Sequence, residues 1–590
     1  MYILGITEKG HDSAACLLQN GKLLSFVEEE RLTRIKNAPN QYPFKASHFC
    51  LQKANINLSD VAYIAVGWNL NKYEGYMQQF YKKLDNDYNK DHVTRLNERM
   101  LLARFNREQV IEEIRQGFLK EGYSLSQFPN IVFVDHHLAH AASSYYSSGF
   151  RKATILTIDG AGEDIGTAVW YGEGASITLV DDYQLPHSLG WFYAAITEYL
   201  GFLSNSHEGK VMGLAAYGCE DRRIREVLQK VLCIRNGRYY VDPNYIFYGD
   251  HNFGIRFTDL LVAELGKPRR RNEEITQFYK NVAYVAQDII EEVIINMVKD
   301  YTEKLDSRNV CLAGGVAMNC KLNGEIADLP GVNSVFVQPA SSDAGTALGA
   351  AMIVSQNNGY DPRFTMTHAY WGPNYSNNEV LSALQLAKVR YTYIENPSEV
   401  AAKLLAQNKI LGWFQGASEV GARALGARSI LANPSGPEMK SSLNSVVKFR
   451  EAWRPFAPSL IIENAEEVFD SRDETPFMLV ARRVLAEKRD VIPSAIHIDG
   501  TARPQTVTRE ANPRYWELIN QFQKITNVPA ILNTSFNIKD EPIVSSPLDA
   551  IRCFYSTGLD ALVIENYLIL KDESLLTHEL LNNVEEFIAI

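Results

Sequence analysis

Short apolar runs alternate with helical stretches along the first part of the chain. The segments "MYILGIT" at the start, "VAYIAVGW" at 61–68 and "ATILTIDG" at 153–160 have the length and composition of buried strands. Asn20-Gly21 lies between two apolar runs and predicts a tight hairpin turn. The stretch 276–305 carries apolar residues at i, i+3 and i+4, which predicts one long amphipathic helix. Two similar strand–hairpin units, near 1–30 and near 153–180, indicate a duplicated core.

The texture changes after about Val354, where Asn, Gly, Pro and Tyr become frequent, as in a linker. A second set of apolar runs follows, including "KILGWFQG", "APSLIIE" and "VPAILNTSFN". A chain of 590 residues is too long for a single core. We therefore predict two α/β domains, 1–355 and 356–590, with the last helix of the second packing back on the first.

Composition narrows the class of protein. With 46% hydrophobic and 22% charged residues the chain resembles an ordinary globular protein, and its net charge of -11 argues against a nucleic-acid partner. No apolar run approaches the ~18 residues of a spanning helix, and the N-terminus has no signal-peptide pattern. The seven cysteines are scattered and never spaced as C-x-x-C. We expect a cytoplasmic protein with no membrane partner, and a homodimer remains possible.

Three of the 12 histidines fall within five positions of "VDHHLAHAASSYY", residues 134–146. On a helix, His136 and His140 share one face and could bind one metal ion, whereas His137 would point elsewhere. The alternative is a group of histidines that only pack at a helix start. Asp343 is a distant candidate for a third ligand, although an acid at a helix N-terminus is also favoured by the helix dipole alone.

"GHDSAA" at 10–15 places His11 beside Asp12 after the first strand. An imidazole next to a carboxylate is suited to take a proton from a hydroxyl, so His11 is a candidate general base. Asp12 as a helix N-cap with an incidental histidine is the alternative.

Two glycine turns follow apolar strands and could receive phosphate. "TIDGAGEDIG" contains Asp159 and Gly160, and "LAGGVAMN" contains Gly314 and Gly315. Exposed backbone N–H groups in such turns bind phosphate oxygens, so the pair predicts a nucleotide cleft. Lys210 in "HEGKVMGLAAYG" could supply counter-charge, or be a solvated lysine.

The second half concentrates cations among small and apolar residues. Guanidinium groups there fit phosphate or carboxylate, and surface salt bridging is the alternative. The cations are Arg423, Arg428, Lys448, Arg450, Arg454 and Arg503, and "ILNTSFN" adds polar residues that include Asn533 and Ser535.

These stretches together resemble the NodU/CmcH-type O-carbamoyltransferases, which include enzymes of the tobramycin and saxitoxin pathways. The resemblance covers nearly the whole chain. It rests on "GHDSAA", "EEERLTR", "DHHLAHAASSYY", "DGAGE", "GKVMGLAAYG", "GGVAMNCKLN", "SSDAGTALGAA", "RALGARSILANP", "FREAWRPFAP", "DGTARPQTV" and "LNTSFN". It implies an actin-like ATPase fold with a duplicated core, shared with threonylcarbamoyl-adenosine synthases, followed by a YrdC-like domain that forms carbamoyl-adenylate.

The implied reaction has two steps. The second domain makes carbamoyl-adenylate from carbamoyl phosphate and ATP, with Mg²⁺ as a further cofactor, and the first domain transfers the carbamoyl group to a small-molecule hydroxyl. The resemblance implies His11 as base with Asp12 beside it, and His136, His140 and Asp343 as ligands of an iron(II)-type metal. It further implies a nucleotide site of Asp159, Gly160, Lys210, Gly314, Gly315 and Asn319. The implied carbamoyl phosphate and ATP site comprises Arg423, Arg428, Lys448, Arg450, Arg454, Arg503, Asn533 and Ser535.

The chain departs from the family pattern at Ala417 and Ala422, where relatives tend to carry arginine and proline. The early stretches suggest a guanidinium alkaloid of the saxitoxin type as the acceptor. Two rivals remain: a tRNA threonylcarbamoyl-type transferase, which a net charge of -11 does not favour, and a non-catalytic nucleotide-binding interaction protein. A hydrogenase-maturation carbamoyltransferase is disfavoured because C-x-x-C pairs are absent.

Overall fold

The computed structural model describes residues 1–251, 256–448, 450–451, 453–454, 456–471, 473–577 and 580. It divides into two compact units. The first comprises Met1–Glu29 and Pro39–Thr365, and the second comprises Glu30–Ala38 and Met366–Ile590. The first unit thus continues to Thr365, whereas the sequence texture suggested 355, and a short N-terminal segment belongs to the second unit. The terminal helix predicted to pack on the first domain lies outside the described residues.

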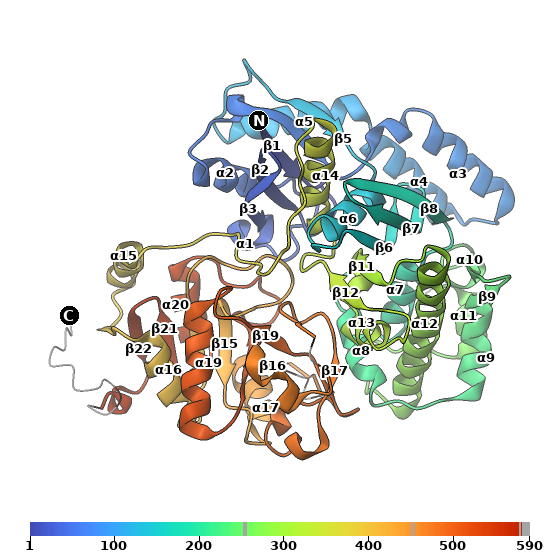
Figure 1. The fold of residues 1–590 in the computed structure, drawn as a ribbon. Helices are drawn as coiled ribbons and strands as arrows, with labels where there is room; N and C mark the ends of the chain where they lie inside the picture. Colours follow the sequence, from blue (N-terminus) through green and yellow to red (C-terminus); the bar gives the residue numbers. More distant parts are fainter. Residues whose placement is uncertain are drawn as a thin grey trace. The chain divides into compact units, whose positions relative to one another are not determined.

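The first unit is built on two five-stranded sheets that follow the same path (Figure 1). Each begins with three antiparallel strands and continues with two parallel ones. The orders are β3-β2-β1-β4-β5 and β12-β11-β6-β7-β8. This repeat confirms the predicted duplication. The strands are β1 Tyr2–Ile6, β2 Ala14–Gln19, β3 Lys22–Glu28, β4 Val61–Val66, β5 Asn130–Phe133, β6 Lys152–Gly162, β7 Ile165–Glu173, β8 Ser176–Gln184, β11 Asn309–Ala313 and β12 Ser334–Val337.

Helices α6 (His136–Tyr145) and α14 (Ala344–Asn357) connect these sheets. Each follows the last strand of one sheet and packs on the other sheet, and the two helices pack against each other. Small residues permit this contact: a Cβ on Gly349 would lie 1.7 Å from the carbonyl oxygen of Ala139. A Cβ on Gly5 would similarly lie 2.0 Å from the carbonyl oxygen of Ala347. The two helices therefore come into close contact where Gly349 of α14 faces Ala139 of α6.

The remaining helices surround this core, and the predicted long helix is α12. The larger ones are α2 Phe44–Lys53, α3 Tyr76–Asp87, α4 His92–Arg104, α5 Arg107–Lys120, α7 Leu189–Tyr199, α8 Glu208–Ala215, α9 Arg222–Val231, α11 Asp259–Leu265, α12 Gln277–Lys304 and α13 Cys320–Ala327. The predicted hairpin turn is formed by Asn20 and Gly21, which have φ values of 49° and 84°. Among the described residues, no helix has both the length and the apolar character that a membrane crossing needs.

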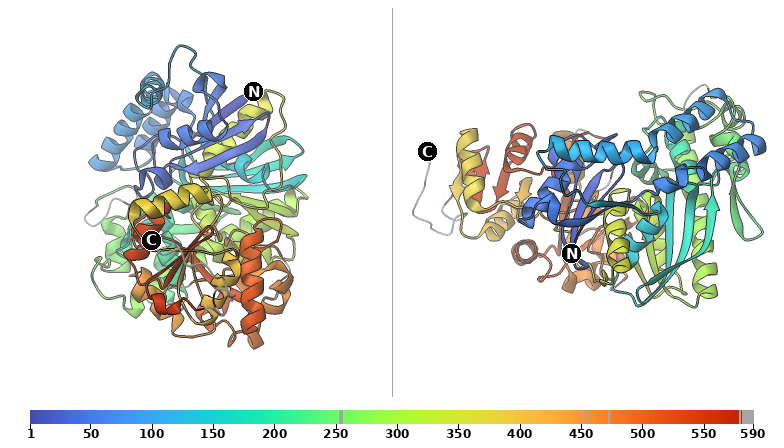
Figure 2. Two further views of the ribbon diagram at one scale, coloured as in Figure 1. Left: turned by 90° about the vertical axis from the view of Figure 1, so that its left-hand side faces the viewer. Right: turned by 90° about the horizontal axis from the view of Figure 1, so that it is seen from above.

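The second unit contains a mixed eight-stranded sheet in the order β13-β22-β21-β14-β15-β20-β16-β19. The β14–β21 and β16–β19 pairs are parallel and the others antiparallel. Helices lie around this sheet (Figure 2). The strands are β13 Thr392–Tyr393, β14 Leu411–Phe414, β15 Arg428–Ala432, β16 Ala457–Ile461, β19 Gln505–Val507, β20 Ala530–Ser535, β21 Ala561–Ile564 and β22 Tyr567–Leu570. The larger helices are α15 Asn377–Ala387, α16 Pro397–Ala406, α19 Pro513–Thr526 and α20 Pro547–Tyr555.

Candidate active site

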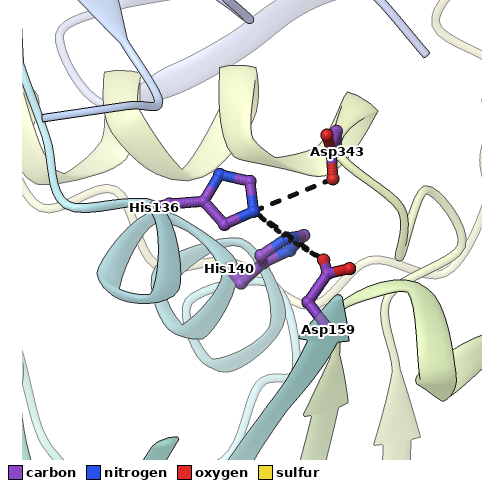
Figure 3. A group of neighbouring side chains, drawn as sticks. All are labelled: His136, His140, Asp159 and Asp343. Carbon is purple, nitrogen blue, oxygen red and sulfur yellow. Dashed lines mark hydrogen bonds and ion pairs between the residues drawn. The ribbon is translucent and has the colours of Figure 1, made fainter. Parts of the chain in front are cut away.

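Four side chains from three distant stretches converge in the first unit (Figure 3). His136 and His140 project from the start of α6, Asp159 from β6, and Asp343 immediately precedes α14. One ligand atom from each lies within 4.8 Å of the others. The histidines and Asp343 were predicted to lie together, and the structure confirms it. Asp159 was assigned to the nucleotide cleft, but its Oδ2 lies 3.0 Å from His140 Nε2.

The geometry of the two histidines fits a cation. Nδ1 of His136 lies 3.1 Å from the carbonyl oxygen of Gly67, an arrangement in which Nδ1 carries the proton. The Nε2 atoms of His136 and His140 are only 3.1 Å apart. Two imidazole nitrogens and two carboxylates form a donor set that suits iron(II), zinc or a similar divalent ion.

The pKa values of His136, His140, Asp159 and Asp343 are shifted from their ordinary values. Burial tends to lower the pKa of His136, but Asp159 and Asp343 together raise it to about 9. Burial lowers the pKa of His140 and raises that of Asp343. The pKa of Asp159 is held well below its ordinary value, against the effect of burial, by its contacts with the two histidines. The carboxylate of Asp159 is therefore ionised and available to a metal.

His137 serves a different purpose from its neighbours. Its Nδ1 lies 2.9 Å from Thr157 Oγ1, and its Nε2 lies 3.0 Å from the carbonyl oxygen of Ile165. Burial, assisted by the charge of His136, lowers the pKa of His137 to about 3. His137 is thus a neutral residue that ties α6 to β6 and β7, as expected from its place on another face of the helix.

Glu163 fixes the start of α6, beside the group of His136, His140, Asp159 and Asp343, which we call the metal group. Glu163 was not identified from the sequence. Its Oε1 accepts hydrogen bonds from the backbone N–H of Asn69 at 2.6 Å and of His136 at 3.3 Å. Burial raises the pKa of Glu163 to about 7. No local pattern marks this contact, because Glu163 meets the N-terminus of α6 only through the packing of β6 against that helix.

His11 lies at the accessible edge of this group. Its Nε2 is 3.8 Å from Asp343 Oδ2, its Nδ1 is 3.4 Å from Asp12 Oδ2, and its side chain is 40% exposed. Asp343 is the main cause that raises the pKa of His11 to about 10. A cation held by Asp343 would offset that negative charge and bring His11 closer to the range of a general base.

The predicted nucleotide residues are brought together only in part. Asp159 accepts hydrogen bonds from the N–H groups of Gly160 at 2.6 Å and Gly315 at 3.3 Å, so both N–H groups already have a partner. Gly314 has a φ of 91°, and a Cβ there would lie 2.3 Å from the carbonyl oxygen of Ile158. Glycine is therefore required in this turn.

Asn319 and Lys210 were predicted to contact nucleotide, and in the structure both lie against other side chains of the first unit. The amide of Asn319 pairs with that of Gln287, with both N–O distances at 3.1 Å, and its oxygen also caps α13. These contacts give Asn319 a structural role, and its place in a nucleotide site stays a prediction. Lys210 is buried on α8, with its Nζ 5.6 Å from the centre of the Phe202 ring.

In the second unit Arg450, Arg454 and Arg503 form the predicted cationic cluster. Nε of Arg450 donates to Asn444 Oδ1 at 2.7 Å. Burial lowers the pKa of Arg450, and the charges of Arg454 and Arg503 lower it further. Burial also lowers the pKa of Arg454, which Glu451 partly offsets and Arg503 lowers again. Lys440 and His497 were missed by sequence analysis; the pKa of Lys440 is lowered by burial and by Arg450, and that of His497 to about 4 by burial despite Asp499. Such crowding of like charge favours an anion.

Lys448 ends the helical segment Leu443–Lys448, and its Nζ reaches oxygen atoms at the end of β20. Its Nζ donates to the carbonyl oxygen of Ser535, to Asn537 Oδ1 at 2.8 Å and to Ser535 Oγ at 3.2 Å. Burial, with Arg450 as the next cause, lowers the pKa of Lys448 well below its ordinary value. Ser535 is thus part of the Lys448 environment, as predicted for the same site.

Two predicted anion-binding residues turn out to be structural. Arg428 is fully buried on β15, and its guanidinium donates to the carbonyl oxygens of Gln415, Gly416, Ala427 and Pro373 at 3.0–3.1 Å. An anion would have to displace these bonds. Asn533 Nδ2 donates to Ser459 Oγ at 3.1 Å and Gln505 Oε1 at 3.0 Å inside the core.

Arg423 lies on the connection between β14 and β15, which also carries Ala417 and Ala422. Arg423 and Ala417 are half-buried and Ala422 is exposed. We refer to residues 415–427 as the arginine loop. It is the part of the cationic region where the chain departs from the family pattern.

Family models match both parts of the chain. A model of the carbamoyltransferase N-terminus matches residues 2–352, and one of the carbamoyltransferase C-terminus matches residues 402–571. The chain belongs to the carbamoyltransferase family. This carbamoyltransferase is 37% identical to nodulation protein NolNO of Sinorhizobium fredii, over 95% of this chain and 79% of that one. It is 39% identical to nodulation protein NolO of Bradyrhizobium diazoefficiens, over 74% and 79% respectively. It is also 35% identical to an uncharacterised protein of Synechocystis, over 97% of each chain.

Proposed function

We propose that this carbamoyltransferase is an ATP-dependent O-carbamoyltransferase that works through carbamoyl-adenylate. The observation that carries the proposal is the position of His11 beside the group of His136, His140, Asp159 and Asp343. The cationic cluster of the second unit has the opposite character and suits anionic substrates. A basic cluster that suits the anionic substrates of the first step and a general base beside a metal-binding group for the second support a two-step transfer through an adenylate.

In the first step, carbamoyl phosphate reacts with water and yields carbamate and phosphate. A carbamate oxygen attacks the α-phosphorus of ATP, the bond to the β-phosphate breaks, and pyrophosphate leaves with the electron pair. We assign Arg423, Arg450, Arg454, Arg503 and Lys448 to binding these anions, with Mg²⁺ accompanying ATP. The step is needed because carbamate is a poor acyl donor and AMP is a good leaving group.

In the second step, the oxygen of an acceptor hydroxyl attacks the carbonyl carbon of the adenylate. AMP leaves with the electron pair, and His11 takes the hydroxyl proton. Asp12 lies 3.4 Å from Nδ1 of His11 and orients its ring. A divalent metal, iron(II) by the resemblance, would be held by the four-residue group and would supply positive charge for the donor's phosphate and carbonyl oxygens.

We propose a small-molecule acceptor that carries positive charge, such as a guanidinium alkaloid of the saxitoxin type. Glu8, Asp12 and Asp343 lie around His11. Burial and, to a lesser extent, Asp343 raise the pKa of Glu8, which also pairs with Arg104 at 2.8 Å. Such a field would attract a cationic alcohol. The repeated strand order supports an actin-like ATPase fold for the first unit, and the YrdC-like character of the second, the homodimer and the cytoplasmic location stay predictions.

The test separates the two steps with two variants. Wild-type protein, given ATP, Mg²⁺ and carbamoyl phosphate, is expected to release pyrophosphate and form carbamoyl-adenylate. His11→Ala should retain this step but lose about 10²–10⁴-fold in AMP release from supplied carbamoyl-adenylate, the usual contribution of a general base. Arg503→Ala should show the reverse pattern, because it lacks an anion contact and keeps the base.

Two outcomes would contradict the proposal. Absence of pyrophosphate release by the wild type would leave a nucleotide-binding protein without this chemistry. Loss of pyrophosphate release in His11→Ala, with normal transfer from supplied carbamoyl-adenylate, would reverse the division of labour. Incubation with candidate alcohols, read by the mass gain of one carbamoyl group, then identifies the acceptor.

A further inference from the structure

The motif "EEERLTR" has no role in the chemistry described so far. Most of it lies in the segment Glu30–Ala38, which we call the strap. The strap follows β3 of the first unit in sequence, yet it belongs to the compact second unit. It also lies inside the stretch 2–352 matched by the N-terminal family model. A part of the N-terminal sequence therefore contributes to the unit that carries the cationic cluster.

Arg31 connects the strap to the arginine loop. Its side chain is 2% exposed, and its Nη2 donates to the carbonyl oxygen of Gly421 at 2.8 Å, across 390 positions of sequence. Glu30 pairs with Arg31 and accepts from the backbone N–H of Asn37 at 2.7 Å, which closes the strap on itself. Gly421 has a φ of 96° and precedes Arg423 by two positions. Arg31 thus fixes the backbone two positions before Arg423, a candidate for anion binding.

The end of the arginine loop is held by Glu419, within the loop, and by Tyr370. Oε1 of Glu419 accepts from the N–H groups of Leu425 at 2.6 Å and Arg428 at 3.2 Å. The hydroxyl of Tyr370 donates to the carbonyl oxygen of Leu425 at 2.6 Å. These contacts hold residues 425–428. Backbone N–H groups of Ser418 and Val420 donate to the carbonyl oxygens of Pro373 at 2.9 Å and Ala369 at 2.8 Å, so Arg31 adds a hold on Gly421, between these two fixed parts. Removing Arg31 would leave residues 418–420 and 425–428 in place and loosen the short stretch between them, which contains Arg423.

Arg34 makes an equivalent connection to a second loop. Its Nη1 and Nη2 donate to the carbonyl oxygens of Ile543 at 2.5 Å and Pro542 at 2.9 Å. The preceding turn is closed by Asn537, whose Nδ2 donates to the carbonyl oxygen of Glu541 at 2.7 Å. Oδ1 of the same Asn537 accepts from Lys448. Arg34 therefore fastens the loop that holds Lys448.

We propose that the strap positions the carbamoyl-adenylate-forming site, with Arg31 and Arg34 as positioning residues for Arg423 and Lys448. This inference rests on the proposed function, because it assigns the strap to the first step of that reaction. Each guanidinium offers a planar fork of donors that matches fixed backbone carbonyls, so it holds a loop more rigidly than a lysine would. When a loop that carries ligand-binding cations is displaced by about 1 Å, the ligand is bound and oriented less well and the reaction slows.

The experiment uses the full-length protein and measures the two steps separately. Arg31→Met and Arg34→Met are expected to lower kcat/KM for pyrophosphate release from ATP and carbamoyl phosphate by about 10- to 100-fold, mostly through a higher KM for carbamoyl phosphate. AMP release from supplied carbamoyl-adenylate should stay within about two-fold of the wild type, because the strap has no part in that step. Arg31→Lys should recover part of the loss, since it restores one donor and the charge.

Arg269→Met is the matched control. Arg269 is also buried, and its guanidinium donates to the carbonyl oxygens of Leu200 at 2.6 Å and Glu273 at 2.7 Å in the first unit. Its loss should lower the unfolding temperature without a selective effect on pyrophosphate release. Thermal unfolding of every variant shows whether stability alone explains a change.

The outcomes separate this inference from the proposed function. Wild-type kinetics in both folded strap variants would overturn the strap's role, as would equal losses in the two steps or a selective loss in Arg269→Met. A wild type that releases no pyrophosphate from ATP and carbamoyl phosphate would overturn the proposed function itself.

Discussion

At the scale of single residues, burial and the nearest partner decide what each side chain does. His136, His137 and His140 lie within two turns of one helix, yet His137 is fixed by Thr157 and Ile165 while the other two face carboxylates. The cations of the second unit divide in the same way. Arg428 and Lys448 are both buried and both donate to oxygen atoms, but Lys448 also lies beside Arg450, which lowers its pKa further.

Lys448 should couple anion binding to proton uptake. Its pKa is lowered by burial and by Arg450, and a bound anion would raise it again. At pH values between the pKa of Lys448 in the free protein and its pKa in the anion complex, anion binding therefore takes up a proton. The affinity for the anion falls as pH rises in this range, by at most about tenfold per pH unit. Sulfate does not titrate in this range, so its binding, followed by calorimetry in buffers of different ionisation heat, reports the protein's proton alone. Lys448→Met should lose the uptake, and Lys524→Met, an exposed control on α19, should keep it; equal uptake in wild type and Lys448→Met would contradict the assignment.

At the scale of elements, the metal group depends on small residues where helices approach backbone. Gly349 lets α14 pack against α6, and this contact brings Asp343 to the histidines. Gly162, at the end of β6, plays a similar part: a Cβ there would lie 2.5 Å from Cδ2 of His136 and 2.8 Å from Cδ2 of His137. The geometry of the ligands is thus set by close packing around them.

Gly162→Ala should displace the first turn of α6. We expect an unfolding free energy lower by about 1–3 kcal/mol, the usual cost of overpacking, and weaker binding of Co²⁺ or Fe²⁺ in calorimetric titration. Gly209→Ala is the control, because a Cβ at Gly209, on α8, would meet nothing within 4 Å. Unchanged metal affinity in Gly162→Ala would show that the start of α6 tolerates displacement.

At the scale of the whole molecule, each compact unit carries one of the two candidate sites. The His–Asp group and His11 belong to the first unit, and the cationic cluster, the arginine loop and the strap belong to the second. The two units differ in the charge that their sites offer. The acidic group needs a cation for balance, whereas the basic cluster needs an anion.

Metal binding should therefore stabilise the protein through the first unit. Fe²⁺ or Co²⁺ at about 100 times its dissociation constant adds about 2.7 kcal/mol to the stability of the folded state. We expect the unfolding temperature of the wild type to rise with added metal, and that of Asp159→Asn to rise much less. Pyrophosphate release should persist after treatment with a chelator and return of Mg²⁺ alone. A metal-induced shift of equal size in Asp159→Asn would remove Asp159 from the ligand set.

The sequence by itself determined the features that depend on neighbours along the chain. Periodicity placed the strands, the hairpin at Asn20-Gly21 and helix α12, and the four-residue spacing put His136 and His140 on one face. The family motifs added the pairing with Asp343. The concentration of arginines likewise indicated the cationic cluster, because residues that are close in sequence, such as Arg450 and Arg454, stay close in the folded chain.

Only the tertiary structure decided which distant groups meet. Asp159 joins the metal group because β6 ends beside α6, and Arg428 lies inside the core because four backbone carbonyls surround it. Arg31 reaches Gly421 across 390 positions. A buried arginine and a ligand-binding arginine have the same side chain, and backbone carbonyls have no sequence signature. Their partners are therefore set by packing and not by local pattern.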